Sequence, residues 1–499
     1  MIEQLLLDDH SRGKLAVYGQ LLTLSPGEHL IDNLRENLET TISMVKLKKI
    51  LVSIQEDLEK ISNKQLLTAK NKLIIRERMI HYNQYQNFLT TQSIPYQLLL
   101  SIIKKQDEDL ASFCQRNYIS RSTCFRQTKK LAQYFKDYHI TLNLTNLTNL
   151  TLTGSEMLIR IMFFNFFWFV SLGESLDDLY FSDDLKALFE LYEAEHLKDK
   201  YAIGKKQAML HCKINLLRIK EGHFTDIYEL TPTSFIPSGT DLEFFYDFFQ
   251  LANLKLDILE INSLFYLFYY WPFLNSKSDV QLPIVEHSYL QANNHLKKVL
   301  EEFETHCQKY ISNFNFHEEP SLHANIYLSL LNFTVFKQKI PLTTFFISTY
   351  IQKKYPMIQI LATKIESYWK KIANRKNFLW LKNCSSELAF IQACLLYPYY
   401  TKLEEDYKLK VGFINVSEYL ITYEIFNLGE KIPFIEIEKA HLPLTKQYDF
   451  FIIGSPLLIP PELDPAKYAV IDFCRYNDFE TALYQRLSHA HHEKLKKQL

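Results

Sequence analysis

The sequence predicts a mainly α-helical, multidomain protein with two winged helix-turn-helix domains, two helical bundles and a small carboxy-terminal α/β domain with a parallel sheet. Three observations support this. Apolar residues recur at helical spacing along most of the chain, which has only 11 Gly among 499 residues. A basic-faced helical segment within 107–137 has a counterpart 77 residues earlier. After about residue 408, short apolar runs alternate with helical segments, which favours a parallel sheet.

The length of the chain requires several hydrophobic cores, because 499 residues exceed what one core organises. A turn at Thr153-Gly154-Ser155-Glu156 and a proline-bounded region at Pro272–Pro283 mark two of the breaks. We therefore expect winged helix-turn-helix domains at 1–76 and 77–154, helical bundles at 155–282 and 283–405, and the α/β domain at 406–499.

The segment 107–137 has the pattern of a helix–turn–helix. A short helix is expected from Leu110 to Arg116, and a tight turn follows at Tyr118 and Ile119. Ser120 then stands where a helix N-cap is expected. The apolar face of the second helix is formed by Cys124, Thr128, Leu131 and Phe135, which repeat at intervals of four, three and four residues.

The opposite face of the second helix is basic and polar. At 100° per residue it carries Ser122, Arg126, Lys129 and Gln133, with Lys130 at its edge. Arg and Gln can bond base edges in the DNA major groove, while Lys and Ser can bind phosphate. The alternative is a helical hairpin whose basic face is merely solvated.

Three neighbouring features favour the DNA-binding interpretation. The run 140–152, ITLNLTNLTNLTL, is β-branched and alternating, as in the wing of a winged helix. It ends in a turn and a new helix start. The third feature is the repeat at an offset of 77, in which Ser43, Lys46, Leu47, Leu51, Ile54 and Leu58 match Ser120, Thr123, Cys124, Thr128, Leu131 and Phe135.

The first copy of the repeat is expected to contribute less to DNA binding. Its helices are predicted at 12–24, 29–38 and Thr41–Glu59, with a wing near 61–76. The first helix of the second copy is predicted at Ile94–Lys104. Its outward positions Val45, Lys49, Val52 and Glu56 suit phosphates and base edges poorly. We interpret it as an auxiliary contact or a packing module.

The arrangement resembles the Mga family of Gram-positive virulence and metabolic regulators. The resemblance rests on the doubled helix–turn–helix, on ISRSTCFRQTKKL at 119–131, and on LTGSE at 152–156 leading into IRIMFFNFFW. It implies DNA-binding residues at Ser120, Arg121, Ser122, Thr123, Arg126, Gln127, Lys129, Lys130 and Gln133, with Lys46 and Lys49 in the first copy. It further implies a double-stranded promoter DNA partner. The scattered cysteines, without the spacing of a disulfide framework, indicate a reducing cytoplasm.

The helical middle of the chain resembles the paired regulation domains through which the sugar phosphotransferase system controls some transcription factors. Such domains carry phosphorylatable histidines. His211 lies seven residues before Arg218 and eleven before Gly222, the spacing at the first histidine of those domains, although Leu210 replaces the usual acidic residue. His323 begins a similar helix with Leu330 in place of the Arg. The resemblance implies phosphorylation by the phosphocarrier protein; for His323 a solvated or core histidine is the alternative.

The carboxy-terminal segment resembles enzyme IIB of the phosphotransferase system. Strands are expected at Lys410–Val416, Pro433–Ile437, Asp449–Gly454 and Tyr468–Asp472, with helices at Ser417–Leu428 and Asn477–Leu487. The loop after the first strand lacks Cys and His, and Ser417 and Glu418 stand there instead. We therefore expect a non-catalytic module for homo-oligomer assembly, with Tyr419, Tyr423 and Phe426 as an exposed aromatic set.

Charge, cysteine content and hydropathy bear on the partners, cofactors and membrane association of the protein. Residues 1–150 hold 20 Lys and Arg against 15 Asp and Glu, a net +5, and the rest of the chain holds 36 against 42, a net −6. The seven cysteines are scattered without metal-ligand spacing, so no metal, cofactor or disulfide is expected. The amino terminus does not have the pattern of a signal peptide, and Met157–Leu172 is too short for a membrane span.

The leading hypothesis is a non-enzymatic, DNA-binding transcriptional regulator of virulence or carbohydrate-metabolism genes. No GxxxxGK[ST], GxSxG or HExxH motif occurs, so no catalytic residue is predicted. One alternative is a phosphoryl-relay component that uses His211 and the α/β domain. Another is a helical scaffold that does not bind DNA.

Overall fold

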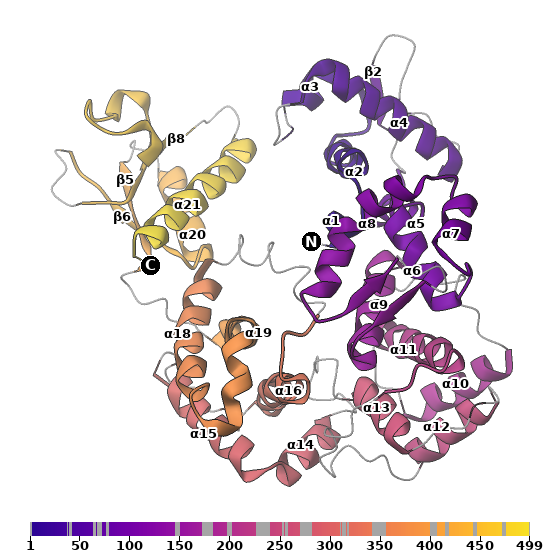
Figure 1. The fold of residues 1–499 in the computed structure, drawn as a ribbon. Helices are drawn as coiled ribbons and strands as arrows, with labels where there is room; N and C mark the ends of the chain where they lie inside the picture. Colours follow the sequence, from indigo (N-terminus) through magenta and orange to yellow (C-terminus); the bar gives the residue numbers. More distant parts are fainter. Residues whose placement is uncertain are drawn as a thin grey trace. The chain divides into compact units, whose positions relative to one another are not determined.

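The computed structural model contains mostly helices, with two small antiparallel sheets near the amino terminus and one parallel sheet near the carboxy terminus (Figure 1). It divides into two compact units, one formed by 1–294 and 327–348, the other by 295–326 and 349–499. The structure describes residues 2–498 except 37, 39–41, 63–65, 67–71, 76–78, 145–149, 172–182, 197–201, 226–239, 252–253, 255–257, 270–281, 310, 312–315, 317–318, 342–355, 400–406, 415–418, 443–446 and 472–475.

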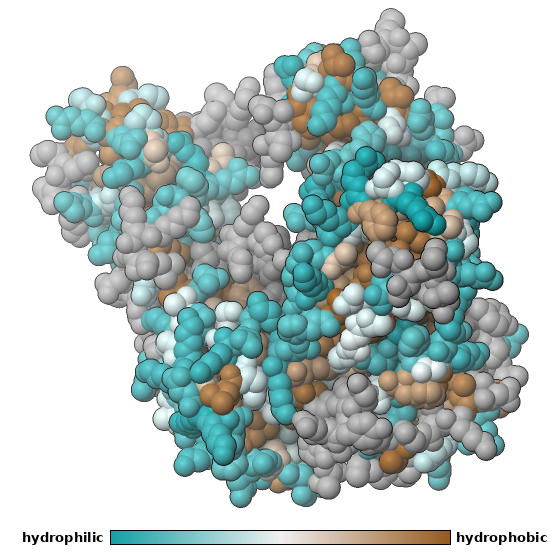
Figure 2. All heavy atoms as spheres, in the orientation of Figure 1, coloured by the Kyte–Doolittle hydropathy of each residue, from teal (hydrophilic) through white to brown (hydrophobic). Residues whose placement is uncertain are grey.

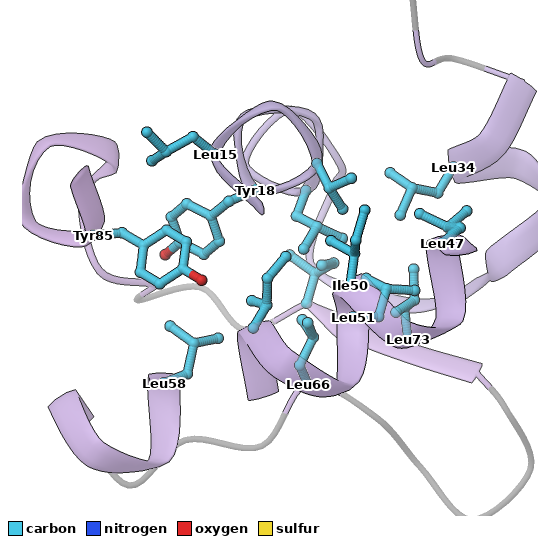
Figure 3. Close-up of a cluster of buried hydrophobic side chains, with 14 of the residues drawn as sticks. Leu15, Tyr18, Leu34, Leu47, Ile50, Leu51, Leu58, Leu66, Leu73 and Tyr85 are labelled. Carbon is cyan, nitrogen blue, oxygen red and sulfur yellow. The ribbon is translucent and has the colours of Figure 1, made fainter. Parts of the chain in front are cut away.

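The first copy of the repeat forms α2 (Asp9–Leu21), α3 (Ile31–Glu36) and α4 (Met44–Ser62). Strands β1 (Gly27–Leu30) and β2 (Lys72–Ile75) pair antiparallel beside them. Figure 3 shows how apolar side chains of α2, α3, α4 and β2 point toward one another, with Tyr85 of α5 (Tyr82–Thr91) closing the cluster. The helix order agrees with the prediction, but β1 and α5 were not predicted.

The second copy consists of α6 (Ile94–Lys104), α7 (Leu110–Arg116) and α8 (Arg121–Lys136). The bounds of α6 and α7 are those predicted. Strands β3 (Thr141–Asn143) and β4 (Thr151–Thr153) form the expected antiparallel hairpin. Gly154 follows at φ +148°, and a Cβ there would lie 3.0 Å from the His139 carbonyl oxygen, so this turn requires glycine.

The repeat at an offset of 77 residues is present in the structure as well as in the sequence. Ser43 Oγ accepts from the amide of Lys46 at 3.3 Å, and Ser120 Oγ accepts from the amide of Thr123 at 3.2 Å. The eight matched core positions of α4 and α8 are all buried. The same offset relates the wings, because the Ile74 amide bonds the Leu66 carbonyl while Thr151 pairs with Asn143.

The long helix α9 (Glu156–Ser171) follows the wing and packs on α8, where Phe166 contacts the rings of Tyr134 and Phe135 at 5.8 and 6.0 Å. The first unit continues through α10 (Asp183–His196), α11 (Ala202–Lys220), α12 (Thr240–Leu251), α13 (Ile258–Tyr269) and α14 (Leu282–Gln291). This region is helical as predicted, and Pro283 lies in the first turn of α14.

The helical part of the second unit contains α15 (Asn294–Cys307), α18 (Pro356–Ile372) and α19 (Ser385–Leu396), with 3-10 turns at Lys376–Asn383 and Tyr397–Tyr399; helix α16 (Pro320–Phe336) crosses the division between the units. Trp369 is fully buried here, donates to Gln392 Oε1 at 2.6 Å and stacks on Phe303. Pro320 and Pro356 begin their helices, as prolines often do.

The carboxy-terminal sheet has the order β6-β5-β7-β8 and is parallel throughout, as predicted. Its strands are β5 (Leu409–Ile414), β6 (Ile435–Lys439), β7 (Phe450–Ile453) and β8 (Tyr468–Val470), with α20 (Tyr419–Lys431) and α21 (Tyr476–Gln498). Residues of both helices share one core cluster with β5 and β7. Phe426 is half-buried and packs on Phe413, so its predicted exposure is wrong, while Tyr423 is exposed.

Candidate nucleic-acid interface

The helix–turn–helix is held rigid by a capping box and an ion pair. Asp109 Oδ1 accepts from the amide of Ser112 at 2.7 Å, and Ser112 Oγ accepts from the amide of Asp109 at 3.1 Å. Arg116 donates Nη2 and Nε to the Asp107 carboxylate at 2.6–3.1 Å. Asp107 also accepts from Ser101 Oγ at 2.7 Å, which joins α6 to α7.

The inner face of α8 is buried as the spacing predicts. Cys124, Thr128, Leu131 and Phe135 are at most 1% exposed. Burial raises the pKa of Cys124 to about 12, so this thiol is a core residue rather than a nucleophile. The polar Thr128 satisfies its hydroxyl by donating to the Cys124 carbonyl at 2.8 Å.

The outer face of α8 presents cationic and polar side chains to solvent. The exposed residues there are Arg121, Ser122, Arg126, Lys129, Lys130 and Gln133. Helix α8 contains no carboxylate. Its C-cap is Asp137, whose Oδ1 accepts from Gln133 Nε2 at 2.9 Å. This hydrogen bond must break before Gln133 Nε2 can bond a base edge.

The amino-terminal end of α8 gathers three hydroxyl groups. Ser120 Oγ lies 2.9 Å from Ser122 Oγ and 3.0 Å from Thr123 Oγ1. Ser120 and Ser122 are exposed, and Thr123 is half-buried. The helix dipole and these hydroxyls together favour an anion such as phosphate at this end.

Helix α1 (Ile2–Leu6) packs against α8 and α6, an arrangement that was not predicted. Its Ile2 and Leu6 are buried. A groove of about 620 Å³ runs along this edge, and its lining includes Asp8, Asp9, Arg126, Gln127 and Lys130. Gln127 is half-buried there and is therefore less accessible than its neighbours on the outer face.

Lys46 and Lys130 approach the same carboxylate from the two copies. The pKa of Asp9 is lowered, first by its hydrogen bond from Arg12 and further by the charges of Arg12, Lys130 and Lys46. Each copy therefore contributes a lysine charge that lowers the pKa of Asp9.

The first copy exposes a mixed face on α4. Lys46, Lys49 and Glu56 are exposed, and Val45 and Val52 are 68% and 48% exposed. Apolar side chains beside a carboxylate offer few phosphate contacts. The inward ion pair of Lys14 with Asp57, at 2.6 Å, leaves Lys14 unable to add to this face.

The wing beside α8 carries a short polar ladder. Asn143 Nδ2 donates to the hydroxyls of Thr151 and Thr153, both at 3.3 Å. The wing tip, 145–149, lies outside the described residues.

A buried charged network connects α9 to the bundle behind it. Arg160 and Arg218 both donate to Glu156, at 2.6–3.1 Å. Arg160 also bonds Asn215 Oδ1 at 3.0 Å and pairs with Glu260. All five residues are less than 7% exposed. Two guanidinium groups and two carboxylates balance in charge, as a buried set requires.

The two candidate phosphohistidines lie in different surroundings. His211 is 5% exposed and its ring stacks on Phe164, with centroids 3.8 Å apart. Arg218, seven residues after His211, donates to the carboxylate of Glu156. His323 is half-buried, with Nε2 3.1 Å from Glu304 Oε1 in the second unit. A phosphate on His211 therefore requires a local opening.

The carboxy-terminal loop with Ser417 and Glu418, where a catalytic Cys or His was expected to be missing, lies outside the described residues. Among the residues that the structure describes, no His, Cys, Asp and Glu cluster could hold a metal ion, and no helix has the length and hydrophobicity to cross a membrane. On the face drawn in Figure 2, hydrophilic residues predominate and apolar ones form scattered patches.

A helix–turn–helix with an exposed basic second helix and a following β-hairpin defines, by class, a DNA-binding module. Residues 78–167 match the family model described as the Mga helix-turn-helix domain, which confirms the resemblance predicted for this segment. The match includes α5 and most of α9, so it extends beyond the predicted boundary at 154. A comparison with curated proteins finds no match to the chain.

Proposed function

We propose that this chain is a non-enzymatic transcriptional regulator that binds double-stranded promoter DNA through α8. The observation that carries the proposal is the exposed, carboxylate-free face of α8 within a segment similar to the Mga helix-turn-helix domain. A merely solvated face would not need a rigid turn fixed by the Arg116–Asp107 ion pair.

The residues of α8 divide by chemistry. Arg126 and Gln133 are the base readers, because guanidinium and amide groups can bond base edges in pairs. Lys129, Lys130 and Ser122 bind phosphates, and Arg121 and Ser120 add contacts at the anion-favouring end of the helix. Lys46 and Lys49 make auxiliary contacts.

Regulation by sugar status forms the second part of the proposal. The phosphocarrier protein phosphorylates His211, and His323 is a secondary acceptor. A phosphate adds about −1.5 to −2 charges. Because His211 stacks on Phe164 of α9, that charge would displace the helix that follows the wing. The target genes are those of virulence or carbohydrate metabolism, and the protein acts in the cytoplasm.

Assembly forms the third part. The α/β segment has its own buried core and contributes a homo-oligomer contact without catalysing phosphoryl transfer. Tyr423, 60% exposed on α20, suits such a surface. A dimer would bring two copies of α8 to one promoter.

The test is a salt titration of the whole chain on labelled duplexes. Binding should weaken linearly in a log–log plot, with a slope of about −0.9 for each phosphate contact in B-DNA. Binding should also be tighter on a selected duplex than on random sequence. A chain that binds neither duplex at 50 mM salt does not have the proposed function.

A further inference from the structure

The turn between α7 and α8 ends with an aromatic residue in a glycine-like conformation. Tyr118 has φ +53°, and the amide of Ile119 bonds the Cys114 carbonyl at 3.0 Å across the turn. This is the pattern in which a helix closes on a left-handed residue, usually glycine because a side chain there is strained. Among the described residues, Lys105, His139 and Lys337 also adopt this conformation at helix ends, so the conformation alone carries no function.

The side chain of Tyr118 distinguishes this turn from the others. It is 97% exposed, more than any other large hydrophobic residue of the described chain. Packing within the protein therefore does not compensate for a strained aromatic residue at this position. Strain without an internal compensation is typical of residues that serve an external contact.

The surroundings of Tyr118 indicate what that contact is. The residue stands two positions before the N-cap Ser120, at the end of α8 that gathers hydroxyl groups and carries Arg121. The Arg116–Asp107 ion pair fixes α7 immediately before the turn. An exposed ring on a fixed backbone turn, beside a cationic, anion-favouring helix end, complements the apolar sugar and base edges of a nucleic acid.

We propose that Tyr118 is a DNA contact of the second helix–turn–helix. Its ring packs on deoxyribose or a thymine methyl group beside the bases that α8 reads. The inference rests on the proposed function and adds a residue to it. The contact is non-ionic, so its loss lowers affinity without releasing fewer counterions.

The experiment compares Tyr118→Asn, Tyr118→Phe and Lys129→Ala in the full chain, with Tyr246→Ala on α12 as a control for loss of another exposed tyrosine. Asn tolerates the left-handed conformation, so the fold is kept, and thermal unfolding checks this. The probe is a 40-base-pair duplex, of the order of four helical turns, selected by the wild-type chain from a random pool. Fluorescence anisotropy gives the affinity at each of several salt concentrations.

Tyr118→Asn should bind about tenfold more weakly with an unchanged salt slope, and Tyr118→Phe should retain most of the affinity. Lys129→Ala should flatten the slope. The inference is overturned if Tyr118→Asn binds like wild type, or if its salt slope flattens as in Lys129→Ala. If the wild-type chain selects no duplex, the proposed function fails and this inference with it.

Discussion

Arg218 donates two hydrogen bonds to the carboxylate of Glu156, from Nε at 2.9 Å and from Nη2 at 2.6 Å. Glu156 begins α9 directly after the wing, while Arg218 lies in the last turn of α11. Arg160 donates to the same carboxylate at 3.1 Å. One buried carboxylate therefore ties the end of the DNA-reading module to the helical region that follows it.

Replacing this carboxylate should be strongly destabilising. Glu156→Gln leaves two buried guanidinium groups short of a counter-charge, and breaking a buried pair typically costs about 3–5 kcal/mol. Urea unfolding followed by Trp fluorescence measures the loss. The matched control is Glu190→Gln, because Glu190 pairs with Lys186 at 3.9 Å on an exposed helix face. That variant should change stability by less than about 0.5 kcal/mol, and equal losses would refute the role of Glu156.

Stability of the α/β segment should fall in mild acid because of His491. Burial lowers the pKa of His491 to about 4, and its Nε2 lies 2.9 Å from the Tyr407 carbonyl, which can only accept. In the unfolded chain its pKa is near 6.5. The neutral ring thus contributes stability that is complete above about pH 6.5 and is lost as pH falls toward 4.

The loss should amount to about 2–3 kcal/mol for His491, read as falling hydrogen-exchange protection in β5 and α21. His491→Phe is the matched variant. It keeps an aromatic ring beside Phe434, on which His491 stacks at 4.7 Å, and removes the titration. Hydrogen-exchange protection in this variant should change less with pH between 6.5 and 4 than in the wild type. The same fall in both proteins would assign the effect to other groups.

Phosphorylation of His211 should be slow and should depend on local opening. With the phosphocarrier protein and a phosphate donor, mass spectrometry under acid-avoiding conditions should detect phosphohistidine at His211. Phe164→Ala should accelerate it, since that change removes the ring stacked on the imidazole. His211→Ala should abolish this signal and alter transcriptional output. If no phosphohistidine forms in either wild type or Phe164→Ala, regulation through this residue is ruled out.

Removal of 407–499 should lower the oligomeric state and leave the rest folded, because this segment has a core of its own. Light scattering gives the mass, and cooperative binding to a duplex with two sites should weaken in parallel. Tyr423→Ala should have a smaller effect in the same direction. An unchanged mass after the deletion would contradict an assembly role.

Local signals predicted much of the fold. The N-cap Ser120, the four-three-four spacing of Cys124, Thr128, Leu131 and Phe135, and the β-branched wing all describe interactions within a few residues of one another. The parallel sheet followed from the alternation of strands with helices, and its strand Phe450–Ile453 is buried at every position. The exposed cationic face of α8 followed directly from the same periodicity.

The remaining features depend on contacts distant in sequence. Helix α1 is only five residues long, too short for a periodic signal, and β1 (Gly27–Leu30) does not alternate. The buried ion pairs of Arg160 with Glu260 and of Arg218 with Glu156 each join two different helices, so no local pattern predicts them. The exposure of Tyr118 could not be predicted either, because it depends on the backbone conformation of the folded turn.

The most direct test of the central claim compares Arg126→Ala and Lys129→Ala of α8 with Lys49→Ala of α4 in salt-dependent binding to one selected duplex. The α8 variants should lose far more affinity. A lost base contact should cost roughly 1–3 kcal/mol, and each lost phosphate contact should flatten the salt slope by about 1. Lys49→Ala should stay close to wild type. Equal losses from α8 and α4 would contradict the assignment of α8 as the main DNA reader.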